Sequence, residues 1–133
     1  MDPTQDVLAT VERFNDVFNQ KDVEAVMEMM TPDVVFENTS GGRFEGQDTV
    51  RAVLDRAFGL MSAGWFETEE ITALGDRAVV LWKYVFDMEH PERGHIRGAD
   101  VFRVRGDRVA EKFSYVKSEE FVQKLGLQLP SSS

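Results

Sequence analysis

Residues 95–117 read HIRGADVFRVRGDRVAEKFSYVK, and this stretch decides the fold because it predicts two antiparallel strands joined at 106–107. Side chains of a strand alternate between the two faces of its sheet. Asp100 and Phe102 therefore share one face of the strand His95–Arg105, while three arginines occupy the other face. Because the arginines need water or a partner, Asp100 must point into the apolar interior. A buried carboxylate is costly unless it is paired or protonated, so Asp100 serves either structural pairing or chemistry.

The register of this hairpin decides which side chains accompany Asp100. A plain two-residue turn places Phe113 opposite Asp100 and brings Glu111 inward. A β-bulge shifts the pairing by one residue and brings a different set of side chains inward: Lys112, Ser114 and Val116. In that register Lys112 can pair with Asp100 and keep it ionised. Without Lys112, Asp100 becomes a neutral hydrogen-bond donor, and the hairpin alone leaves both states open.

Along the rest of the chain, the spacing of apolar residues changes from helical to strand-like. Helical periodicity covers 7–18, 22–30 and 50–61, with Asp22 as the cap of the second helix and Pro32 as its stop. Strand patterns cover 34–38, Trp65–Leu74, 77–88, His95–Arg105 and 108–117, and the glycine-containing loop 39–46 follows the first of them. Helices followed by an antiparallel meander predict an α+β domain in which helices cover one face of a curved sheet.

The composition fits one globular domain. The chain has 133 residues, of which 42% are apolar and 29% are charged. A chain of this length can bury a substantial core. We expect a single domain over 1–133, ordered over about 5–127, with a helical turn at 118–125 and a flexible tail at 130–133.

Charge and cysteine content argue against several classes of function. A net charge of −9 without a lysine or arginine cluster argues against nucleic acid and anionic membranes as partners. No stretch approaches the ~20 apolar residues of a membrane span, and the N-terminus lacks a signal-peptide pattern, so we expect a cytoplasmic protein. The chain has no cysteine, and its two histidines lack spaced carboxylates, so we expect no metal. No phosphate-binding glycine motif occurs, so we expect no organic cofactor.

Three phrases of the chain resemble a known family when they are taken in order. They are VERFNDVFNQKDVEAVMEMMTPDVVFEN at 11–38, GRFEGQDTVRAVL at 42–54 and RGADVFRVRGDRVAEKFSYVK at 97–117. The chain resembles the SnoaL-like branch of the nuclear transport factor 2-like superfamily, which includes ketosteroid isomerases, polyketide cyclases and limonene epoxide hydrolases. The resemblance implies a cone-shaped α+β fold, with three N-terminal helices packed on a curved, mainly antiparallel sheet that encloses an apolar pocket. It also favours the bulged register.

The catalytic residues of those enzymes are incomplete in this chain. The resemblance places the late-strand aspartate of the ketosteroid isomerases on Asp100, their base on Asn38 and their tyrosine on Phe14. An amide cannot accept a proton at neutral pH and a phenyl ring cannot donate a hydrogen bond, so we do not expect steroid enolisation by that route. The acid of the cyclases and epoxide hydrolases falls on Ser114, which is a poor acid without a neighbouring base.

The resemblance implies a small hydrophobic ligand, such as a polyketide-, steroid- or terpenoid-like metabolite. We expect Asp100 to be the catalytic residue of an isomerisation, cyclisation, dehydration or hydration. The side chains expected to bind the ligand are Phe14, Asn38, Phe58, Phe102, Lys112, Ser114 and Val116. Each has a structural alternative, since buried phenylalanines commonly form core and Asn38 precedes a glycine loop. The alternative function is a non-catalytic ligand-binding or interaction module that has lost the catalytic residues.

The outer face of the predicted hairpin indicates an interface. In the bulged register Phe113 and Tyr115 point outward beside Val101. Exposed apolar patches of this kind mark interaction surfaces. Together with the family resemblance, the patch predicts a homodimer formed through the outer face of the sheet.

Overall fold

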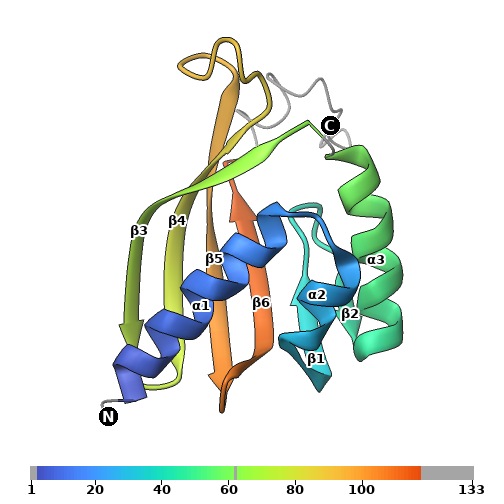
Figure 1. Cartoon of the computed structure of the whole chain (residues 1–133), viewed down its shortest axis with the longest axis vertical. Coiled ribbons are helices and arrows are strands. Elements are labelled where there is room, and N and C mark those ends of the chain that lie inside the picture. Colours follow the sequence, from blue (N-terminus) through green and yellow to red (C-terminus); the bar gives the residue numbers. More distant parts are fainter. Residues whose placement is uncertain (1–2, 62, 118–133) are drawn as a thin grey trace, which may run out of the picture.

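The computed structural model describes residues 3–61 and 63–117 (Figure 1). In this part of the chain the helices are α1 (Pro3–Asn19), α2 (Val23–Glu28) and α3 (Gln47–Leu60). The strands are β1 (Met30–Glu37), β2 (Arg43–Glu45), β3 (Trp65–Leu74), β4 (Arg77–Val85), β5 (His95–Arg105) and β6 (Arg108–Val116). The helical turn predicted at 118–125 and the flexible tail predicted at 130–133 lie outside the described residues.

The strands form one curved, open sheet in the order β2-β1-β6-β5-β4-β3. Neighbouring strands are antiparallel except β1 and β6, which run parallel. Helix α1 lies across one face of the sheet, and α2 and α3 cover the end that carries β1 and β2 (Figure 1). The predicted α+β architecture, with helices on a curved and mainly antiparallel sheet, is therefore confirmed. No helix in the described part of the chain is long and apolar enough to cross a membrane.

The end of α1 is fastened to the start of β3 by polar contacts. The side chain of Asn19 donates to the carbonyl of Phe66 and accepts from its N–H, both at 2.8 Å. Lys21 follows in a left-handed conformation, with φ of 57°, and its ammonium donates to the carbonyl of Gly64 at 2.6 Å. The next helix begins where the sequence predicts, because Asp22 accepts a hydrogen bond from the N–H of Ala25 at 3.2 Å.

Several boundaries differ from the prediction, and the first strand begins at Met30 instead of residue 34. The second helix ends at Glu28, and Pro32 lies inside β1 rather than at a helix end. The pairing of β1 with β6 is irregular between Met30 and Val35, which accommodates a residue without an N–H donor. The predicted loop 39–46 contains the short strand β2, whose three residues are too few to show a periodicity. The predicted strand 77–88 ends at Val85.

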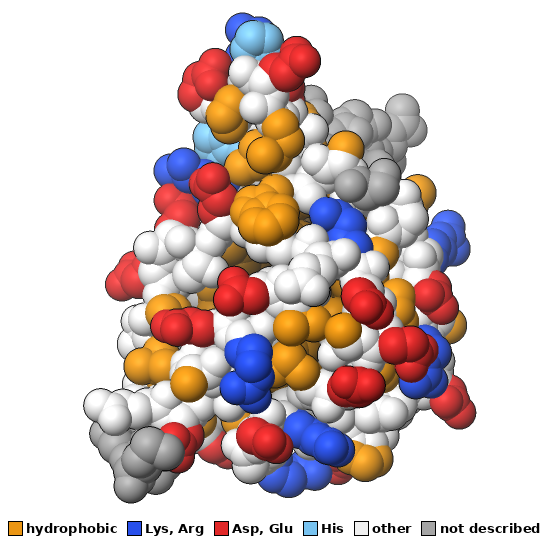
Figure 2. All heavy atoms as spheres, in the orientation of Figure 1, with side chains coloured by type: hydrophobic (Ala, Val, Ile, Leu, Met, Phe, Trp, Pro, Cys, Tyr) orange, Lys and Arg blue, Asp and Glu red, His pale blue; other side chains and the backbone are white. Residues whose placement is uncertain are grey.

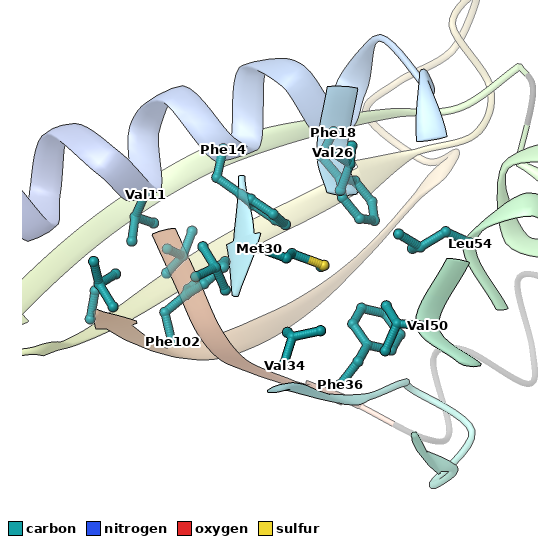
Figure 3. Close-up of a cluster of buried hydrophobic side chains, with 14 of the residues drawn as sticks. Val11, Phe14, Phe18, Val26, Met30, Val34, Phe36, Val50, Leu54 and Phe102 are labelled. Atoms are coloured by element: carbon teal, nitrogen blue, oxygen red, sulfur yellow. The ribbon is translucent and has the colours of Figure 1, made fainter. Parts of the chain in front are cut away.

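The core lies between α1 and the sheet and is rich in aromatic rings. Figure 3 shows Phe14 of α1 and Phe102 of β5 directed toward one another, and their ring centroids are 5.6 Å apart. Phe18, one turn along α1, packs edge-on against Phe58 of α3 at 4.9 Å. The helix thus holds the sheet on one side and α3 on the other.

Candidate functional site

The pairing of β5 with β6 sets the geometry around Asp100. Asp100 lies opposite Ser114, and a shift of register occurs between Arg103 and Val104, close to the turn. This is the bulged register, so that prediction is confirmed. Since alternate residues of a strand share a face, Lys112 and Ser114 point to the same side of the sheet as Asp100.

Asp100 and Lys112 form a buried ion pair. The ammonium of Lys112 lies 3.4 Å from Oδ2 of Asp100, and the two residues are only 5% and 6% exposed, respectively. The same ammonium donates a hydrogen bond to Oγ of Ser114 at 3.1 Å. It also lies 4.9 Å and 5.0 Å from the ring centroids of Phe18 and Phe36, where a cation is attracted to the ring faces. Of the two states left open by the sequence, this geometry favours the ionised pair.

Two buried polar atoms near this pair have no hydrogen-bond partner among the described residues. They are Oδ1 of Asp100 and Nε1 of Trp82. Both residues line a cavity of about 50 Å³, together with Asn15, Phe18, Thr39, Phe66, Thr68, Lys112 and Ser114. A buried donor or acceptor without a partner is unfavourable by about 1–3 kcal/mol. The lining of the cavity therefore includes one residue with an unpartnered acceptor and one with an unpartnered donor, which a bound group could satisfy.

This cavity is much smaller than the predicted apolar pocket. Pockets for small molecules commonly measure about 300–1,000 Å³. Here aromatic side chains fill the interior: Phe66 lies with its ring centroid 5.9 Å from Phe18, 5.1 Å from Trp82 and 4.8 Å from Tyr84. Burial in this cluster raises the pKa of the Tyr84 hydroxyl above its usual value. As it stands, the cavity accommodates a polar group and the first atoms attached to it.

The structure brings together three of the predicted site residues and separates the others. Asp100, Lys112 and Ser114 line the cavity. The residues that lie in the hydrophobic core are Phe14, Phe58 and Phe102. Asn38 shapes the loop before β2, because its Oδ1 accepts from the N–H of Gly42 and from the hydroxyl of Ser40, both at 2.9 Å. Val116 lines a separate surface hollow of about 690 Å³. Whether these residues bind a ligand stays a prediction.

Sequence reasoning missed several residues that line the cavity, including Trp82 and Asn15. Trp82 pairs with Gly98, which shares a strand face with Asp100 two positions away. The register of β4 against β5 would have revealed this, but it depends on the conformation of the connection 86–94. Asn15 follows Val11 by four residues, so its helical position already placed it on the inward side of α1.

Metal ligands are not gathered at this site. Residues 3–61 and 63–117 contain no group of three or more His, Cys, Asp or Glu side chains that could hold a metal ion. The cavity itself carries one carboxylate and one ammonium, an arrangement suited to hydrogen bonding and proton transfer.

Solved structures with the same architecture define the class as nuclear transport factor 2-like. One such protein of unknown function, from Mesorhizobium loti, is 30% identical, with a TM-score of 0.71 over 88% of this chain and 95% of its own. A candidate polyketide cyclase from Xanthomonas campestris pv. campestris is 20% identical, with a TM-score of 0.74 over 93% of this chain and 99% of its own. A candidate SnoaL-like polyketide cyclase from Shewanella putrefaciens CN-32 is 16% identical, with a TM-score of 0.77 over 92% of this chain and 86% of its own.

The family follows from the sequence match. The model of the SnoaL-like domain matches residues 11–112. The chain therefore belongs to the SnoaL-like domain family, as its three phrases predicted. A comparison with curated proteins found no match.

Proposed function

We propose that this SnoaL-like protein binds the oxygenated end of a small metabolite beside Asp100 and transfers a proton to or from it. The observation that carries this proposal is the unpartnered Oδ1 of Asp100, held in a cavity next to the ammonium of Lys112. A carboxylate oxygen with no hydrogen-bond partner is available to take a proton from a bound molecule. Isomerisation, cyclisation, dehydration and hydration all require such a step.

The neighbouring side chains suit the charge that develops in this chemistry. When Asp100 removes a proton next to a carbonyl, negative charge moves to the carbonyl oxygen. Donors already directed at that position stabilise the transition state. The ammonium of Lys112 and the hydroxyl of Ser114 lie within the cavity and can supply these hydrogen bonds.

The proposed class of ligand rests on proteins with a similar fold. Candidate polyketide cyclases are among the similar structures, which supports a hydrophobic polyketide-, steroid- or terpenoid-like molecule. The cavity of about 50 Å³ admits only the reacting end of such a molecule. The remainder of the ligand would lie against the more exposed lining residues, Asn15, Thr39 and Thr68.

A non-catalytic binding module is the second candidate, and the small cavity favours it. Phe14 and Asn38 occupy the positions where the isomerases would have a hydroxyl and a base, and here they serve the core and a loop. A protein of this kind would hold its ligand by the same polar groups without turning it over.

The test combines a binding screen with a proton-exchange assay. Hydroxylated and carbonyl metabolites are screened by thermal shift, and hits are incubated in D₂O while NMR follows exchange beside the carbonyl. We expect exchange in the wild type to be at least about 100-fold faster than in Asp100→Asn. Asp107→Asn, the same change on an exposed turn, is the matched control and should exchange normally. Binding without exchange would favour the second candidate.

Loss of the negative charge in Asp100→Asn leaves Lys112 buried without its partner, so folding needs its own control. The double variant Asp100→Asn with Lys112→Met removes both charges and keeps the side-chain sizes similar. If this folded double variant still catalysed exchange at the wild-type rate, Asp100 would have no catalytic role.

We also propose a homodimer formed through the outer face of the sheet. Tyr115 is 55% exposed there, and Val79 and Leu81 of β4 are each 41% exposed. Phe113 contributes less than predicted, because it is partly buried and the guanidinium of Arg43 lies 5.7 Å from its ring centroid. These exposed apolar residues lie on β4 and β6, the two strands that flank β5, which supports an interface at this face. Figure 2 shows the opposite face, on which α1 lies, and there apolar and charged side chains intermingle.

A further inference from the structure

Trp82 carries the second unpartnered polar atom among the residues that line the cavity, and the proposed chemistry does not use it. Its indole N–H is buried, the residue is 5% exposed, and Nε1 has no hydrogen-bond partner in the described part of the chain. A buried indole N–H usually finds an acceptor, because leaving it unpaired is unfavourable. Asp100, whose Oδ1 is also unpartnered, lines the same cavity.

The indole is held in place by close packing. Trp82 pairs with Gly98 across β4 and β5, and a Cβ at position 98 would lie 2.5 Å from Cζ2 and Cη2 of the ring. Only the absence of a side chain at Gly98 lets the ring lie this close to the backbone. Phe66 packs edge-on against the ring, with centroids 5.1 Å apart and planes at 85°. The direction of the N–H is therefore fixed by its neighbours.

Trp82 and Asp100 are placed to contact one bound group. Val80 lies opposite Asp100, so Trp82 is the diagonal neighbour of Asp100 on the same face of the sheet. Diagonal neighbours in an antiparallel pair are about 7–8 Å apart, within reach of aromatic side chains. An oxygen atom between the two side chains can form a hydrogen bond of about 2.7–3.0 Å to each of them.

The chemistry of the two atoms selects the kind of oxygen. The indole N–H only donates, and an ionised carboxylate only accepts. A single group that satisfies both must accept one hydrogen bond and donate another, which a hydroxyl does. A ketone or ether oxygen can accept from Trp82 and from Lys112, but it has no proton to offer to Asp100.

We propose that Trp82 and Asp100 together form a hydroxyl-recognition site, which takes an alcohol, phenol or enol in preference to a ketone or ether of the same shape. This rests on the binding site of the proposed function, but it does not depend on catalysis. It narrows the substrate class to molecules that present a hydroxyl at the end that enters the cavity. An ether or ketone leaves Oδ1 unpaired, which should weaken binding by at least about tenfold.

The experiment measures binding of two matched pairs of probes: phenol against anisole, and 2-propanol against acetone. NMR titration follows the indole N–H resonance of Trp82 and yields a Kd for each probe. The resonance is assigned with Trp65→Phe, which also serves as the matched control because Trp65 is 45% exposed and lies outside the cavity lining. We expect phenol and 2-propanol to shift the Trp82 resonance and to bind at least about tenfold more tightly than anisole and acetone.

Two variants connect the preference to Trp82. Trp82→Phe removes the donor while keeping an aromatic ring, so it should reduce the preference for the hydroxyl probes and weaken their binding. Gly98→Ala adds a Cβ that meets both the indole and the backbone carbonyl of Tyr115, so it should displace the indole and have a similar effect with the N–H still present. Circular dichroism checks that this variant keeps its fold. Trp65→Phe should retain the preference of the wild type.

The outcomes separate this proposal from the proposed function. Equal binding of the hydroxyl and non-hydroxyl probes, an unchanged preference in Trp82→Phe, or no shift of the Trp82 resonance at millimolar probe would overturn the hydroxyl-recognition site. Proton exchange that depends on Asp100 but shows no hydroxyl preference would support the proposed function alone. A hydroxyl preference without proton exchange would support the recognition site and the non-catalytic alternative.

Discussion

Replacing Lys112 with methionine should destabilise the fold strongly, because it removes one partner of a buried ion pair. The change leaves the carboxylate of Asp100 buried, with Oδ1 already unpartnered and Oδ2 deprived of the ammonium at 3.4 Å. Removing one partner of such a pair typically costs about 3–5 kcal/mol. The attraction between the ammonium and the rings of Phe18 and Phe36 is also lost, although the thioether packs well against aromatic rings.

This loss of stability is large compared with the total free energy of unfolding of a domain of this size. Domains are commonly stable by about 5–15 kcal/mol, so the variant should lose on the order of a third of its free energy of unfolding. Urea denaturation followed by circular dichroism measures this loss. The control is Lys83→Met on the outer face of β4, where the lysine is only half-buried and the change should stay within about 0.5 kcal/mol.

A double-mutant cycle decides whether the pair is responsible. Adding Asp100→Asn to Lys112→Met removes the unpaired charge, so the double variant should be more stable than Lys112→Met by at least about 1 kcal/mol. The reasoning is refuted if Lys112→Met costs less than about 1 kcal/mol, or if the second change makes the protein less stable still.

Three further predictions concern pH, helix capping and assembly. Burial raises the pKa of Tyr84, so its neutral form is favoured in the folded state. The stability that Tyr84 contributes should therefore fall as the pH rises above the usual tyrosine range. Urea unfolding of Tyr84→Phe should show a smaller loss of stability over this pH range, and identical pH profiles of the two proteins would contradict the prediction. Asp22→Ala removes the cap of α2 and should cost about 1 kcal/mol in the same measurement; an unchanged midpoint would show that the cap is not needed. Tyr115→Glu and Leu81→Glu should convert a wild-type dimer to monomer in light scattering; a wild-type monomer at micromolar concentration would exclude the proposed dimer.

The alternation of side chains along each strand was sufficient to predict that Asp100 points inward and to locate most strands of the sheet. Each strand of the hairpin has a buried and an exposed face, and the positions of Asp100 and the arginines distinguish them. The hairpin pattern admitted two registers, and the family resemblance favoured the one that the structure has. Strand β2 could not be predicted, because three residues contain no full alternation and pair only through their contact with β1.

The size of the cavity could not be predicted from the sequence, because it depends on packing between elements that are distant in the chain. Phe18 comes from α1, Phe66 from β3 and Trp82 from β4, and the space left between them depends on how their rings meet. Periodicity identifies each of these residues as inward-facing but gives no volume. The same reason explains why sequence reasoning missed Trp82 as a lining residue of the cavity.

The parallel pairing of β1 with β6 has a consequence for how the chain is made. Met30 pairs with Val109, so the first strand to emerge from a ribosome must wait for the last described one before it gains that neighbour. Until then β1 and β5 both present unpaired edges, which are templates for aggregation. Contacts so distant in sequence also slow folding. The nascent protein is therefore most exposed to aggregation just before β6 enters between these strands, and the step that completes the sheet also brings Lys112 to Asp100.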